Sequence, residues 1–182
     1  IFAALLLLLT GCTGIPENVR PVEHFNLEKY LGKWFEIARL DHSFERGLTH
    51  VSATYSLRED GSVRVLNRGY SEQTKKWQEA EGKAFFVGRT DQGHLKVSFF
   101  GPFYGSYIII ELDAQYQYAL VCGPDRSYLW LLARTPAISP EVKNQLMAQA
   151  ASLGFDTSAI LRICARKDRS GKTDRLFRHE AR

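Results

Sequence analysis

Between Trp34 and Arg134, short runs rich in valine, isoleucine and aromatic residues alternate with residues that favour turns. Runs of this kind are typical of β-strands. They predict eight strands, which span residues 34–40, 51–57, 63–70, 77–86, 94–100, 107–112, 118–122 and 128–134. Several links are short, and the glycines at positions 61 and 93 suit the tight turns of hairpins. Because short links join neighbouring strands, we expect an all-β fold, an eight-stranded antiparallel up-and-down barrel whose closure removes both sheet edges.

One amphipathic helix is expected after the strands. Ser139 suits the N-cap, Pro140 the first helical position and Glu141 the first turn. Apolar residues then recur at helical spacing at positions 142, 146, 150 and 153, and Gly154 is a suitable stop. We expect this C-terminal α-helix to pack its apolar face on the outside of the barrel. Residues 159–164 could add a short further strand.

The excess positive charge is confined to one end of the chain. The formal net charge is +4, and residues 166–182 contain seven Lys or Arg against three Asp or Glu, so the remainder is neutral. Nucleic-acid-binding proteins are expected to carry a basic face on the folded body, and we therefore expect no nucleic-acid partner. The predicted organisation is a partial signal peptide at 1–11, a tether at 12–24, the folded domain at 25–165 and a basic tail, expected to be disordered, at 166–182.

The N-terminal apolar run ends in Leu9-Thr10-Gly11-Cys12, which resembles a bacterial lipoprotein signal. In such a signal the cysteine is acylated and the peptide is cut before it, so Cys12 is the predicted lipid anchor. The alternative is an ordinary secretory signal followed by a chance cysteine; the run is shorter than the about 20 residues that a spanning helix needs. Because Thr13 rather than aspartate follows, the usual sorting rule predicts anchoring to the outer membrane, facing the periplasm. Cys122 and Cys164 could then form one disulfide or remain two thiols, and no Cys/His spacing indicates a metal.

Three local signatures point to a family. They are Gly32-Lys33-Trp34 within residues 30–39, the run CGPDRSYLW at 122–130, and Arg134 followed by Thr135-Pro136. Together with KVSFFGPFYG at 96–105, they resemble the lipocalins, in particular the bacterial outer-membrane lipoproteins allied to apolipoprotein D. The resemblance covers about residues 25–155 and implies a lipocalin barrel in which Trp34 closes one end and Arg134 lies across its indole. Such a cation–π contact contributes about 0.5–2 kcal/mol. The last residues, 161–182, do not resemble the family's usual short ending.

The resemblance also fixes which strand residues face the interior. Side chains alternate between the two faces of a strand, and Trp34 is taken as the floor of a pocket. The predicted ligand-binding residues are Trp34, Glu36, Ala38, Ala53, Tyr55, Val65, Asn67, Phe86, Val97, Phe99, Tyr128 and Trp130. This mostly apolar lining suits a long acyl chain, whose burial contributes about 0.8 kcal/mol per CH₂ group.

The alternative is that these side chains fill a solid core, as in small barrels. Glu36 and Asn67 favour a cavity, because a carboxylate is costly to bury in a dry interior without a partner. The alternative is that the two side chains are satisfied by each other or by Tyr55. At the open end, an anionic head group could meet one of four cations, Arg39, Arg68, Lys83 or Lys96.

Residues 99–104 are rich in aromatic side chains, and their second half is predicted to form a loop between strands. Exposed aromatics there suggest contact with a lipid surface or with a second copy of the protein in a homodimer. Packing under the barrel rim is the competing interpretation.

Catalytic motifs are absent from the sequence. It contains no G-x-S-x-G, H-E-x-x-H, phosphate-binding loop or dinucleotide fingerprint, and its histidines are scattered. We therefore expect neither an enzyme nor a cofactor. The predicted function is that of a lipid-anchored periplasmic lipocalin that binds and carries or stores fatty acids or lysophospholipids, and the resemblance implies a role in outer-membrane maintenance. The alternatives are a barrel that serves as a scaffold for protein–protein interaction, and a lipid-modifying hydrolase.

Overall fold

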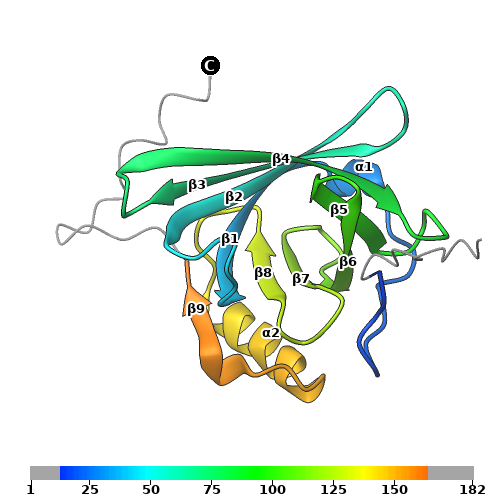
Figure 1. Cartoon of the computed structure of the whole chain (residues 1–182). Helices are drawn as coiled ribbons and strands as arrows, with labels where there is room; N and C mark the ends of the chain where they lie inside the picture. Colours follow the sequence, from blue (N-terminus) through cyan, green and yellow to red (C-terminus); the bar gives the residue numbers. More distant parts are fainter. Residues whose placement is uncertain (1–12, 164–182) are drawn as a thin grey trace, which may run out of the picture.

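The computed structural model describes residues 13–163, which form a closed barrel with one flanking helix. The strands are β1 Gly32–Leu40, β2 Leu48–Leu57, β3 Val63–Ser71, β4 Lys76–Phe86, β5 His94–Phe100, β6 Phe103–Leu112, β7 Tyr118–Cys122, β8 Leu129–Ala133 and β9 Ile160–Arg162. The helices are α1 Leu27–Tyr30, α2 Pro140–Ser152 and the 3₁₀-helix η1 Thr157–Ala159. The sheet runs in the order β2-β3-β4-β5-β6-β7-β8-β1-β9, and β1 also pairs with β2. This extra pairing closes eight antiparallel strands into a barrel and confirms the predicted fold (Figure 1).

All eight predicted strands are present, and β9 falls within the stretch that could add a ninth. The largest difference is at β6, which begins at Phe103 rather than at Tyr107. Phe103 and Tyr104, expected in a loop, therefore lie in a strand. Helix α1 was not predicted; it is a single turn capped by Asn26, whose side chain accepts a hydrogen bond from the Lys29 amide (3.0 Å).

A register shift in β1 changes which of its residues face inward. One edge of β1 pairs with β8, and the register shifts between Glu36 and Ala38, so Ile37 is an inserted bulge residue. Beyond the bulge the alternation is reversed. Ala38, predicted to face the ligand, instead packs in the core outside the barrel, and Arg39, the register partner of Trp130, turns inward.

The other edge of β1 has two partners. Residues from Gly32 to Phe35 pair with β2, whereas Ala38 to Leu40 pair with β9. Strand β2 therefore parts from β1 near the bulge, and β9 covers the edge that is left (Figure 1).

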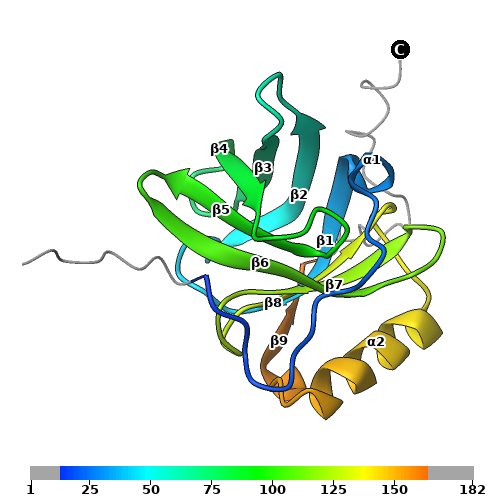
Figure 2. The same cartoon turned by 90° about the vertical axis from the view of Figure 1, so that its right-hand side faces the viewer.

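Helix α2 covers the outside of the barrel, as expected. Ser139 is its N-cap, and the hydroxyl accepts a hydrogen bond from the Val142 amide (3.3 Å). Leu146 and Ala150 are buried against outward-facing residues of the strands. Figure 2 shows α2 packed beneath the barrel beside β9. None of the helices within residues 13–163 is long and apolar enough to cross a membrane.

Cys122 is buried in this outer core, between the strands and α2, and burial raises the pKa of its thiol to about 12. Its predicted disulfide partner, Cys164, lies outside the described residues, so either state of this pair remains a prediction. The predicted signal peptide, the anchor Cys12 and the basic tail also lie outside them.

Residues before α1, expected to be a tether, pack along the barrel. Val19 belongs to the outer core. The Val22 amide donates to the Ile109 carbonyl (2.9 Å), and the Val22 carbonyl accepts from the Gly93 amide (2.9 Å). Close to the start of the described chain, the Gly14 carbonyl accepts a hydrogen bond from the Ser106 hydroxyl on β6 (2.7 Å). This segment is therefore held at a defined place on the barrel wall.

The end of the barrel beside α1 is closed in the way that the resemblance implies. Trp34 is fully buried, and its Nε1 donates to the Tyr30 carbonyl (2.8 Å). The Arg134 guanidinium lies 4.1 Å from the centre of the Trp34 ring. It also donates to the carbonyls of Lys29, Lys33 and Tyr116. The opposite end, formed by the β1–β2, β3–β4, β5–β6 and β7–β8 links, is called the mouth below.

Candidate functional site

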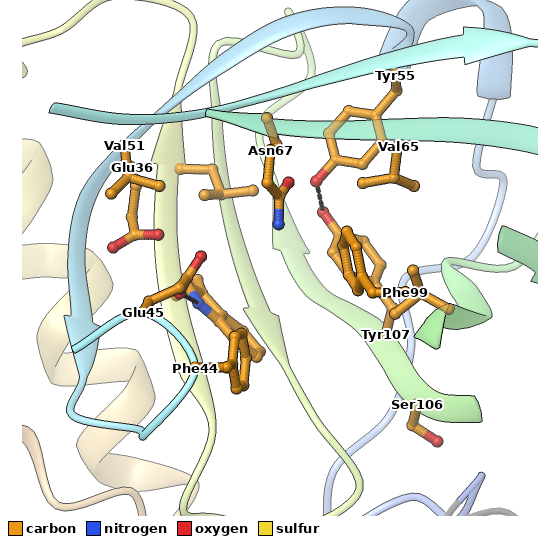
Figure 3. A pocket seen from close by; sticks show the side chains of 14 residues that line it. Glu36, Phe44, Glu45, Val51, Tyr55, Val65, Asn67, Phe99, Ser106 and Tyr107 are labelled. Atoms are coloured by element: carbon orange, nitrogen blue, oxygen red, sulfur yellow. Dashed lines mark hydrogen bonds between the residues drawn. The ribbon is translucent and has the colours of Figure 1, made fainter. Parts of the chain in front are cut away.

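The barrel interior is hollow. It contains a cavity of about 90 Å³, several times the roughly 10–15 Å³ that a single water molecule requires. Figure 3 shows this cavity, and its walls are formed by Glu36, Phe44, Glu45, Val51, Ala53, Tyr55, Val65, Asn67, Val97, Phe99, Ser106, Tyr107, Trp130 and Leu132. Most of these side chains are aliphatic or aromatic. The competing interpretation of a barrel filled solidly by its own side chains does not describe this structure.

Most of the predicted ligand-binding residues come together at this cavity. Its walls include Glu36, Ala53, Tyr55, Val65, Asn67, Val97, Phe99 and Trp130. Trp34 and Phe86 face inward but lie deeper, in the inner core. Tyr128 lies beside the mouth, where its ring packs on that of Trp130 with centroids 6.0 Å apart. Ala38 is outside the barrel because of the β1 bulge.

Three tyrosine hydroxyls form a chain of hydrogen bonds; Tyr55 and Tyr107 line the main cavity, and Tyr30 lines only the smaller cavity next to it. The Tyr107 hydroxyl is 2.7 Å from that of Tyr55 and 2.8 Å from that of Tyr30. A second, smaller cavity of about 20 Å³ shares Tyr55 and Tyr107 as walls and also contacts Phe25. Burial raises the pKa of each of the three tyrosines, so their hydroxyls stay neutral. The trio therefore separates the main cavity from the closed end without placing a charge there.

The β1–β2 link, residues 41–47, lies at the mouth and contributes two cavity residues that the sequence analysis missed. These are Phe44, which is 57% exposed, and Glu45, which is buried. The Glu45 carboxylate accepts a hydrogen bond from Trp130 Nε1 (3.1 Å) and lies 3.0 Å from His42 Nε2. The ring of His42 in turn stacks on Phe44, with centroids 4.0 Å apart.

Glu36, in the cavity wall, is hydrogen-bonded to Arg39, and both side chains are buried. Arg39 Nη1 donates to Glu36 (2.6 Å), and Nη2 donates to the Glu45 backbone carbonyl (2.7 Å). Burial is the largest effect on the Glu36 carboxyl. Together with the nearby charge of Glu45, it raises the Glu36 pKa to about 8 against the opposing effect of Arg39.

The cations proposed for an anionic head group do not line the cavity. Arg39 is directed inward but is occupied by Glu36 and Glu45. The others lie on the outer surface: Arg68 over the Trp77 ring (4.4 Å), Lys83 on Asp60 (2.5 Å) and Lys96 over the Tyr104 ring (5.2 Å). The structure therefore gives no support to an anion site made by these four residues.

Residues 25–165 match the family model of the Lipocalin-like domain. This chain belongs to the lipocalin family. The lipocalin is 55% identical over 157 residues to the outer membrane lipoprotein Blc of Vibrio cholerae serotype O1, a match covering 86% of this chain and 92% of that protein. It is 32% identical over 146 residues to apolipoprotein D of Rattus norvegicus, covering 76% of each. Insecticyanin from the tobacco hornworm Manduca sexta shares the fold, with a TM-score of 0.67 at 22% identity, covering 82% of this lipocalin and 86% of that chain.

These relatives confirm the resemblance to the bacterial outer-membrane branch allied to apolipoprotein D. The name of the bacterial relative also agrees with the predicted outer-membrane localisation of this lipocalin. The relatives are named as lipoproteins and lipocalins rather than as enzymes, which agrees with the expectation of a non-catalytic protein.

Proposed function

We propose that this lipocalin binds one single-chain amphiphile, a fatty acid or a lysophospholipid, in its barrel. In this proposal the protein is anchored through Cys12 to the outer membrane, faces the periplasm, and carries or stores the amphiphile there for membrane maintenance. The observation that carries the proposal is the hollow interior, which has an apolar wall and lies next to the mouth.

Apolar burial supplies the driving force for binding. The cavity wall includes Val65, Val97, Phe99 and Leu132, whose side chains carry no hydrogen-bonding group, so a methylene chain meets only apolar atoms beside them. Each buried CH₂ group contributes about 0.8 kcal/mol. A chain of about ten methylenes would therefore offset the cost of immobilising the ligand and ordering the wall.

The β5–β6 hairpin supports an exchange of ligand with a membrane. Its tip carries Phe100 and Phe103, which are 80% and 67% exposed. Gly14, two residues after the proposed anchor, is held to Ser106 on the same hairpin. Gly14 and the exposed aromatics thus lie at the same hairpin of the mouth, from which an amphiphile could pass between bilayer and barrel.

A cavity-filling substitution tests the proposal. Ala53 lines the cavity, whereas Thr54, the next residue on β2, lies on the opposite face of the strand. We expect Ala53→Trp to abolish saturable displacement of a fluorescent fatty acid, and Thr54→Trp to leave it unchanged. Trp130→Arg, at the mouth, should also remove binding.

Two results would contradict the proposal. If no amphiphile of any chain length bound to the folded wild-type protein, the barrel would be better explained as a scaffold for a protein partner. If a lysophospholipid or ester were turned over, and the turnover disappeared with a single Ser or His substitution, the protein would be a hydrolase.

A further inference from the structure

A hydrogen bond between two tyrosines crosses the barrel interior. Tyr55 lies on β2 and Tyr107 on β6, and these strands are four positions apart in either direction around the ring of eight. The two tyrosines therefore extend from opposite walls of the barrel. Their hydroxyls meet inside it, with the oxygens 2.7 Å apart (Figure 3). This pair, called the tyrosine bridge below, lies between the mouth and the closed end.

Space exists on both sides of the tyrosine bridge. The main cavity, of about 90 Å³, lies toward the mouth, and the smaller cavity, of about 20 Å³, lies toward the closed end. The two cavities share the bridge and two valines as walls, and the smaller one is otherwise lined by Phe25, Tyr30, Ala84 and Leu95. Its volume corresponds to one or two small groups, at roughly 10–15 Å³ each. The smaller cavity therefore continues the main one beyond the bridge.

A hydrocarbon chain cannot replace the hydrogen bonds of the bridge. The Tyr107 hydroxyl contacts Tyr55 and also Tyr30, at 2.8 Å, and both of these tyrosines are buried. A methylene group that entered between the hydroxyls would separate them without offering a donor or an acceptor. A buried hydroxyl without a partner is costly, because it has lost water as well. Chain burial is therefore favourable up to the bridge and is opposed at the bridge itself.

We propose that the hydrogen bond between Tyr55 and Tyr107 sets the longest acyl chain that this lipocalin binds without loss of affinity. This inference rests on the proposed lipid-binding function and adds to it the residues that determine chain length. Each carbon buried on the mouth side of the bridge raises the affinity about fourfold. Further carbons raise it no more, because they must open the bridge. Without the Tyr107 hydroxyl, the two cavities join and the end of the chain extends into the smaller one.

Amphiphiles that share a head group but differ in chain length test the inference. The probes are saturated fatty acids from octanoate to stearate and lysophosphatidylcholines with the same acyl chains, each displacing a fluorescent fatty acid below its micelle concentration. For the wild-type protein we expect the affinity to rise about fifteenfold per two-carbon step and then to level off within the series. Tyr107→Phe should move this chain limit to a longer acid and raise the affinity for that acid about tenfold.

Three further variants complete the test. Tyr55→Phe removes the other hydroxyl of the bridge and should move the limit in the same direction, so the inference remains testable if Tyr107→Phe does not fold. Ala84 lines the smaller cavity but not the main one, and adding Ala84→Val to Tyr107→Phe should restore the wild-type limit. Tyr104→Phe removes a hydroxyl on the outer face of β6, beside Lys96, and should leave the limit unchanged.

The outcomes distinguish the inference from the function on which it rests. If the affinity of the wild-type protein rose without a break through the stearoyl chain, the tyrosine bridge would set no limit, although lipid binding would stand. A limit that stayed at the wild-type length in both Tyr107→Phe and Tyr55→Phe would also overturn the inference. If no member of either series bound to the folded wild-type protein, the proposed function itself would be wrong.

Discussion

Arg134 stabilises the closed end of the barrel by stacking on Trp34 and by donating to three backbone carbonyls. We predict that Arg134→Met lowers the free energy of unfolding by about 2 kcal/mol, because the cation–π contact and the hydrogen bonds are lost together. Urea denaturation measures this loss. Arg89→Met removes a guanidinium that is 63% exposed and should cost far less. Equal losses in the two variants would contradict the assigned role of Arg134.

Glu36 gives the stability of the protein a defined pH dependence. Its pKa is raised to about 8 in the folded protein, whereas an unfolded glutamate titrates near about 4.3. Between these values the folded state retains a proton that the unfolded state has lost, so stability falls as pH rises and the loss is complete above about 8. We predict that Glu36→Gln flattens this part of the melting-temperature profile between pH 5 and 8. If the melting temperature of the variant fell with pH as steeply as that of the wild type, a group other than Glu36 would bind this proton.

At the scale of elements, the β5–β6 hairpin is the part of the mouth best suited to meet a bilayer. Phe100 and Phe103 lie at its tip, and Lys96 lies on the same hairpin. In a Cys12→Ser background, which removes the proposed acyl anchor, we predict that replacing both phenylalanines with serine weakens binding to phospholipid vesicles about tenfold. Leu57→Ser is the matched control, since Leu57 is 57% exposed but lies at the end of β2 away from the mouth.

The same experiment discriminates between a membrane and a second copy of the protein. If the double variant left vesicle binding unchanged but shifted the sedimentation of the protein toward a smaller species, the hairpin would serve a homodimer instead. Phe100 and Phe103 are exposed, so these two side chains do not pack under the barrel rim.

Local patterns in the sequence were sufficient to predict the strands, because alternation and turn residues are properties of short segments. The bulge at Ile37 could not be predicted in this way, since a strict period of two contains no sign of an inserted residue. Ala38 is therefore expected inside, which is the wrong face, and the inward turn of Arg39 toward Glu36 is not predicted. Phe44 and Glu45 were missed for a different reason: they reach the cavity from a link without periodicity, and only the tertiary fold brings them there. Tyr107, by contrast, could have been found by extending the alternation along β6.

At the scale of the whole molecule, the barrel separates two cores with different roles. The outer core, between the strands and α2, is densely packed with aliphatic side chains and stabilises the fold. The inner core is closed by Trp34 and Arg134 at one end and becomes hollow toward the mouth. The family resemblance correctly implied the closed end, whereas the chain of tyrosine hydroxyls in the interior emerged only from the structure.

Native mass spectrometry of the protein extracted from its own membrane tests most directly whether this hollow holds a lipid. We predict one single-chain amphiphile per polypeptide in the wild-type protein and in Thr54→Trp, and none in Ala53→Trp, where the indole occupies the space of the chain. A wild-type protein without any bound lipid, or an Ala53→Trp variant that retained the same lipid, would contradict a ligand inside the barrel.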